Sequence, residues 1–159
     1  MKSFGKILLI LAGVLVLFSI FACNSIKPYT PPPAETIRSK IVGEWFLIEM
    51  EDFEGTYYIS DGISFVLPES PENGLHGFAG VNLYNGSAEF SDKDFILGPI
   101  GVTKMLGEDE EMESEENFLR LLSLCTSVKI EKITTADGNT YPHLILFNET
   151  DGIKLTFTK

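Results

Sequence analysis

The strongest constraint on the fold is a set of turn-forming dipeptides that divide the second part of the chain into short runs. Asparagine or aspartate followed by glycine tolerates positive φ angles and closes tight hairpins. Connections this short favour antiparallel neighbours, because parallel strands need a long crossover. The five pairs are Asp61-Gly62, Asn73-Gly74, Asn85-Gly86, Asp137-Gly138 and Asp151-Gly152.

The runs between these turns have the composition and length of strands. In the last run the apolar residues Ile153, Leu155 and Phe157 alternate with polar ones, which is typical of a strand with one buried face. We predict strands at residues 44–50, 56–59, 63–67, 78–82, 87–90, 94–97, 127–134, 141–147 and 153–158.

One helix is predicted among the strands, over residues 113–125. Its apolar residues Phe118, Leu121, Leu122 and Cys125 follow the spacing of a single helical stripe. We therefore expect an α+β, mostly β fold: antiparallel strands forming a strongly twisted sheet or partly open barrel, with one packed α-helix. Recurrent glycines in or beside strands suit a sheet that bends sharply.

The N-terminus has the features of an export signal. Lys2 and Lys6 precede an apolar stretch of 15 residues, Ile7 to Phe21, which matches a signal peptide and is short for a membrane span. The stretch Ile20-Phe21-Ala22-Cys23 resembles a bacterial lipobox, although Phe21 is larger than usual. An uncleaved anchor and an ordinary secretory signal are the alternatives, and all three export the domain.

The lipoprotein reading divides the chain into three parts. Residues 1–22 are the signal peptide, residues 23–39 are a lipidated Cys23 with a proline-rich tether, and residues 40–159 are one domain. Prolines 28 and 31–33 favour an extended spacer, although such a run can also be a docking ligand. The membrane partner is lipid, through acylated Cys23. Because Asn24 and not aspartate follows the cysteine, resemblance to enterobacterial sorting favours the outer membrane over the inner membrane.

Charge and motifs exclude several function classes. The formal charge is −11, and it becomes −13 without residues 1–22, which argues against binding nucleic acid. No nucleophile elbow, P-loop or zinc-protease motif is present, and His76 and His143 are far apart in sequence. We expect no catalytic residues, no cofactor and no metal site. With Cys23 acylated, Cys125 is left alone, and we expect it in the core.

An acidic run between Glu108 and Glu116 opens the predicted helix. Negative charge near a helix N-terminus is favoured by the helix dipole, so a solvated helix start explains the run. The alternative is a calcium site or a contact for a basic partner, but the glycine of an EF-hand loop is absent.

Several motifs together resemble the META domain, the family of the HslJ-like heat-shock lipoproteins. The glycine-rich stretch from Gly77 to Ser87 resembles the centre of that domain, and the resemblance covers nearly all of residues 41–159. It singles out Trp45, Gly77, Gly80, Asn82, Gly86, Gly98, Pro99, Thr103, Lys104, Met105 and Glu115. Glu115 paired with Lys104 or with a backbone amide would be a structural network before it is a binding site.

The chain departs from the family pattern at three positions. Relatives often have cysteines where this chain has Val81 and Gly107, and if those cysteines pair, this protein has lost the whole bridge. Lys104 stands where the family has arginine, which would weaken a bidentate contact.

The resemblance implies a non-enzymatic envelope protein linked to stress response. We expect a monomer that acts as an interaction module for an envelope protein partner. The alternative is a carrier that holds a small apolar ligand in the barrel. A dry cavity lined by Phe65, Phe78 or Phe90 would favour the carrier.

Overall fold

The computed structural model describes residues 36–69, 74–134 and 138–159. These residues belong to one compact unit, Ala34–Lys159. The predictions for the signal peptide, for Cys23 and for most of the tether lie outside the described residues. Among the described helices, none is long and apolar enough to cross a membrane.

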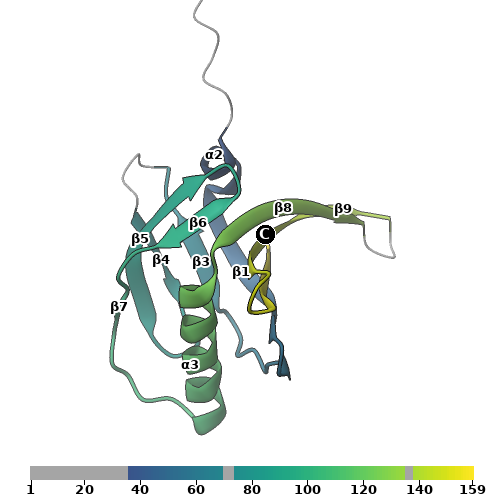
Figure 1. Ribbon diagram of the computed structural model, residues 1–159. Helices are drawn as coiled ribbons and strands as arrows, with labels where there is room; N and C mark the ends of the chain where they lie inside the picture. The colour runs from purple at the N-terminus through teal and green to yellow at the C-terminus, as the bar shows by residue number, and fades with distance from the viewer. Residues whose placement is uncertain (1–35, 70–73, 135–137) are drawn as a thin grey trace, which may run out of the picture. The chain divides into compact units, whose positions relative to one another are not determined.

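Ten strands and two helices form the described domain (Figure 1). In chain order they are α2 (Ile37–Ile41), β1 (Gly43–Asp52), β2 (Gly55–Thr56), β3 (Ser64–Leu67), β4 (Gly74–Phe78), β5 (Leu83–Ser91), β6 (Asp94–Leu97), β7 (Gly101–Val102), α3 (Asp109–Leu124), β8 (Ser127–Thr134), β9 (Thr140–Asn148) and β10 (Ile153–Thr158).

The strands close into an antiparallel barrel of eight strands. The order β10-β9-β8-β6-β5-β4-β3-β1 becomes a ring because β1 also pairs with β10, while β2 extends β1 and β7 pairs with β5. Two seams are narrow: β3 meets β4 through Val66 and His76, and β6 meets β8 through Asp94 and Ser127. The prediction of a mostly β, antiparallel, curled fold with one packed helix is confirmed.

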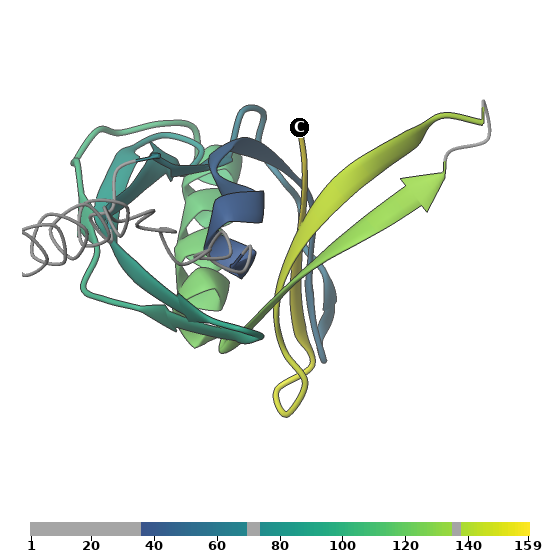
Figure 2. The same cartoon turned by 90° about the horizontal axis from the view of Figure 1, so that it is seen from above.

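Helix α3 fills the space between opposite walls of the barrel (Figure 2). The ring of Phe118 lies 5.7 Å from that of Tyr84 on β5 and 6.4 Å from that of Phe157 on β10. Those strands are separated by three others in either direction around the ring, so one helical side chain contacts both sides of the core. The apolar stripe predicted for this helix is therefore buried, and burial raises the pKa of the Cys125 thiol to about 12.

The short helix α2 is held by the tryptophan of β1. The indole Nε1 of Trp45 donates to the carbonyl of Ile41 at 2.7 Å, and the ring is 1% exposed. The ammonium of Lys159 lies 4.6 Å from the centroid of the Trp45 ring and makes a cation–π contact with it. Trp45 thus joins α2, β1 and the C-terminus.

Two predicted strands and one predicted turn are wrong. Of the run at 56–59 only Thr56 is in a strand, and the backbone groups of Tyr58 and Ser60 bond to the Ser114 side chain on α3. The run at 78–82 is mostly a turn: β4 ends at Phe78, and the chain reverses through Gly80, whose φ is +126°. The Asn85-Gly86 pair lies inside β5 and closes no hairpin.

Helix α3 begins at Asp109 and not at Glu113. The amide of Glu108 donates to the Glu111 carboxylate at 3.2 Å, which closes the first turn. The acidic residues therefore belong to the helix itself.

The β8–β9 hairpin forms an arm that extends beyond the barrel (Figures 1 and 2). Its side chains from Glu131 to Thr134 are exposed, as are those of Thr140 and Tyr141, whereas Leu144 is fully buried. Only the base of this hairpin therefore belongs to the core.

Candidate functional site

Asn82 is the centre of a polar network that joins three segments of the family motif. Its side-chain amide donates to the Glu115 carboxylate at 2.9 Å and to the carbonyl of Met105 at 3.3 Å. Its side-chain oxygen accepts from the Met105 amide at 2.6 Å and from the Thr103 hydroxyl at 2.9 Å. The turn after β4, the loop after β7 and helix α3 are thereby fixed to one another.

The Glu115 carboxylate is 6% exposed and is satisfied by amides. The backbone N–H groups of Val81 and Asn82 donate to one of its oxygens at 3.0 and 2.6 Å. Lys104 is exposed and makes no hydrogen bond or ion pair with any described residue. Of the two predicted pairings of Glu115, the structure has the one with backbone amides.

The motif glycines allow close approach of neighbouring strands. A Cβ on Gly77 would collide with the Ser64 carbonyl and come within 2.8 Å of the Tyr84 ring, and the hydroxyl of Tyr84 donates to the same carbonyl at 2.8 Å. Gly80 has a φ of +126°, a backbone angle that residues other than glycine rarely adopt.

The remaining motif residues lie apart from the Asn82 network. Gly86 lies inside β5 against the carbonyl of Pro99, and the amide of Gly98 donates to the Ser87 carbonyl at 2.8 Å. Trp45 lies at α2. The motif residues are thus distributed over the barrel wall, and their contacts hold the fold together.

Val81 and Gly107, the two positions where relatives often have cysteine, are in contact. A Cβ on Gly107 would lie 2.6 and 3.0 Å from the two methyl carbons of Val81. Cysteine side chains at these two positions would therefore be adjacent, as a disulfide requires.

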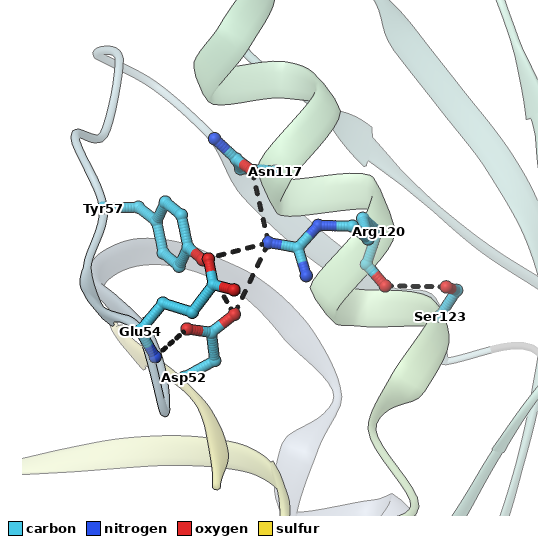
Figure 3. A network of polar contacts seen from close by, with 6 residues as sticks. All are labelled: Asp52, Glu54, Tyr57, Asn117, Arg120 and Ser123. Carbon is cyan, nitrogen blue, oxygen red and sulfur yellow. Dashed lines mark hydrogen bonds and ion pairs between the residues drawn. The ribbon is translucent and has the colours of Figure 1, made fainter. Parts of the chain in front are cut away.

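A second polar cluster joins the loop after β2 to helix α3 (Figure 3). The hydroxyl of Tyr57 donates to the Asp52 carboxylate at 2.8 Å, and the Arg120 guanidinium lies 3.2 Å from that hydroxyl and 3.5 Å from the carboxylate. Arg120 also donates to the Asn117 side chain at 3.3 Å, and the Glu54 amide donates to Asp52 at 2.8 Å.

These contacts shift the pKa values of Asp52 and Tyr57. Burial favours the neutral acid, yet the hydrogen bonds from Tyr57 and the Glu54 amide, with the charge of Arg120, hold the pKa of Asp52 below its ordinary value. The hydrogen bond to Asp52, and then burial, raise the pKa of the Tyr57 phenol. The cluster is therefore an ionised carboxylate and guanidinium bridged by a neutral phenol.

A pocket of about 270 Å³ opens beside this cluster, between the loop after β2 and one face of α3. The helix supplies residues three, four and seven positions apart, which share that face. The lining residues are Tyr57, Tyr58, Glu110, Glu113, Ser114 and Asn117. The Ser114 hydroxyl accepts from the Ser60 amide at 2.9 Å and donates to the Tyr58 carbonyl at 3.2 Å, which fixes the loop over the helix.

Neither this cluster nor this pocket is predicted by the sequence pattern. Tyr57 and Tyr58 were assigned to a strand, and the partners lie 63 residues apart in the case of Tyr57 and Arg120. One signal was available: Arg120 is the only basic residue in the helix sequence from Asp109 to Leu124. A single cation on an acidic helix suggests a specific partner.

The two histidines lie in separate strands, His76 on β4 and His143 on β9. His76 is exposed, and His143 is 9% exposed with no partner for its Nδ1 among the described residues. Within the described part of the chain, no three side chains of the metal-binding types converge on one point.

The comparisons with known proteins agree with this architecture. The solved NMR structure of a protein from Burkholderia xenovorans is 19% identical, matches 86% of this chain and 97% of its own, and superposes with a TM-score of 0.53. At that identity the likeness shows the fold alone. No curated protein matches the chain significantly. The family model of the META domain matches residues 41–159, three quarters of the sequence, and the chain therefore belongs to the META domain family.

Proposed function

We propose that this chain is an exported, lipid-anchored protein of the cell envelope whose META domain is a non-catalytic interaction module. Cys23, behind its basic and apolar leader, supports the anchor. Several acyl chains on one cysteine would hold the protein stably, since one chain binds a membrane only marginally. The proposed location is the outer membrane, on either its periplasmic or its outer face, and the domain acts there as a monomer.

The observation that carries the proposal is the role of the family-motif residues. Asn82, Glu115 and Thr103 bond to one another and to backbone amides, and Gly77 allows two strands to approach. These contacts stabilise the barrel, which gives the motif residues a structural role. A surface that other proteins contact is then the part of the domain available for function, and stress response in the envelope is the proposed setting.

Crosslinking in living cells tests the interaction module. We expect a photo-crosslinker on the domain surface to capture a reproducible envelope protein, and the Cys23→Ala variant to lose that product because it leaves the membrane. Intact-mass analysis of the purified protein should show residues 1–22 removed and Cys23 acylated. An unmodified, full-length protein in the cytosolic fraction contradicts the anchor, and equal products with and without Cys23 contradict a membrane-dependent contact.

The second candidate is a carrier of a small apolar ligand. A groove of about 330 Å³ between the loop after β6 and α3 favours it, since Leu97, Ile100, Val102 and Leu119 are among its lining residues. The barrel interior is less suited, because Phe65 is fully buried and its ring packs 5.8 Å from that of Phe157. Extraction of a stoichiometric lipid from the purified protein, without a captured partner, would support the carrier.

A further inference from the structure

We propose that the pocket between Tyr57–Tyr58 and α3 binds a basic side chain, arginine or lysine, presented by an extended segment of a protein partner. This inference rests on the proposed interaction module and names the chemistry of its partner. The pocket is lined by two aromatic rings, two carboxylates, a hydroxyl and an amide. Aromatic faces and carboxylates together are the groups that recognise an organic cation.

The two carboxylates of the pocket are free to accept a partner. Glu110 and Glu113 are exposed and make no hydrogen bond or ion pair with any described residue. They lie one helical turn apart on α3 and therefore point to the same side. Tyr58, which is 61% exposed, adds an accessible phenol ring to the pocket lining.

The neighbouring cluster shows that the boundary between the loop after β2 and α3 already accommodates a cation (Figure 3). The guanidinium of Arg120 lies 5.5 Å from the centroid of the Tyr57 ring and is paired with Asp52. Because Asp52 compensates Arg120, the charge of Glu110 and Glu113 remains uncompensated at the pocket. The other acidic residues of the first turn, Asp109 and Glu111, offset the positive end of the helix dipole, which would otherwise oppose a cation here.

The size of the pocket suits a single side chain. Its volume of about 270 Å³ is at the lower end of the roughly 300–1,000 Å³ of typical small-molecule sites. A planar guanidinium can stack on a phenol ring and form two parallel bonds to a carboxylate, so arginine should bind more tightly than lysine. The net charge of the chain attracts a basic segment from a distance.

Peptide titration of the full-length chain in detergent tests the pocket. The probes are blocked tri-arginine, tri-lysine and tri-glutamate peptides, followed by amide chemical shifts in isotope-labelled protein. We expect tri-arginine to shift the amides of Tyr58, Ser114 and Asn117 at low salt, tri-lysine to bind more weakly, and tri-glutamate to have no effect. Shifts spread evenly over the acidic surface contradict the proposal.

Charge-matched variants separate the pocket from the general field of the protein. Glu110→Gln with Glu113→Gln should weaken tri-arginine binding about fivefold, because two partly exposed ion pairs are lost. Tyr58→Ala should weaken it about threefold through the lost ring contact. The control, Glu44→Gln with Glu89→Gln, removes the same charge from exposed positions of β1 and β5 and should change affinity less than about twofold. Equal losses in both double variants overturn the pocket.

The crosslinking experiment distinguishes this inference from the proposed function. A captured partner whose yield is unchanged by the Glu110 and Glu113 substitutions overturns the pocket and leaves the interaction module intact. Failure to capture any partner overturns the module, whatever the peptides do.

Discussion

The side chains of Asn82 and Glu115 join segments of the fold that are distant in sequence. Together they satisfy two backbone amides of the turn after β4 and bond both polar backbone groups of Met105. A carboxylate is required because it accepts several hydrogen bonds and donates none. Its burial is tolerated because each bond is assisted by charge.

Replacing Glu115 by glutamine tests that requirement. Glutamine would place an NH2 donor against an N–H donor at a position where a carboxylate oxygen now accepts. We therefore expect Glu115→Gln to lower the free energy of unfolding by about 1.5–3 kcal/mol. Glu116→Gln is the matched control, since Glu116 is exposed on the same helix and should change stability by less than about 0.5 kcal/mol. Urea denaturation measures both, and equal effects contradict the role assigned to Glu115.

A disulfide should form when cysteines replace Val81 and Gly107. The contact between these positions predicts that the double variant oxidises in air without loss of fold, and a loop of this length should stabilise it by about 3 kcal/mol. Mass spectrometry and thermal melts with and without reductant check this result. Gly107→Ala alone should destabilise, because its Cβ would press on the Val81 methyl groups; a double variant that stays reduced contradicts the placement.

At the scale of elements, the loop after β2 is held by helix α3 as well as by strand β1. Ser60 and Tyr58 bond to Ser114, and Tyr57 bonds to Asp52 and Arg120. The loop and the helix therefore form one wall of the candidate pocket. Weakening the cluster should change the pocket without opening the barrel.

The pKa of Asp52 reports on this wall. Because the pKa of Asp52 is depressed in the fold, its contribution to stability is present above its unfolded value, near 3.8, and is lost as the pH falls through the folded value. Tyr57→Phe removes a bond that lowers this pKa and leaves the effect of burial, so we expect the pKa of Asp52 to rise. Carboxyl-carbon NMR titration measures it, with Tyr58→Phe as control; an unchanged value contradicts the hydrogen bond.

At the scale of the domain, the barrel is a filled core with an arm of different character. The rings of Tyr84, Phe118 and Phe157 pack across the interior, whereas the arm from Glu131 to Thr134 contributes no buried side chain. The stability of the barrel and the presence of the arm should therefore be separable.

Shortening the arm tests that separation. In this variant an Asn-Gly turn replaces residues 132–142. The pairs Ile130–Leu144 and Glu131–His143 are kept, and the two inserted residues connect Glu131 to His143 as a tight hairpin. We expect the free energy of unfolding to change by less than about 1 kcal/mol, because exposed residues add little. A thermal melt measures it, and loss of cooperative unfolding would show that the arm supports the barrel.

The local features of the chain were predictable because they depend on neighbours in sequence. The stripe of Phe118, Leu121 and Leu122 predicts helix α3, and the alternation of Ile153, Leu155 and Phe157 predicts β10. The Asp151-Gly152 pair closes its hairpin as expected, with Gly152 at a φ of +61°. Period and turn chemistry are properties of short segments, and they need no knowledge of the rest of the fold.

The closure of the barrel and the candidate pocket were decided only by tertiary structure. Asn85-Gly86 has the composition of a turn but lies in β5, because pairing with β4 on one side and β7 on the other outweighs its local preference. Asn82 meets Glu115 across 33 residues, and Tyr57 meets Arg120 across 63. By itself the sequence determined most of the strands, the long helix and the family of this protein. Which polar side chains meet depended on how the strands close around α3, since contacts over such separations leave no periodic trace in the chain.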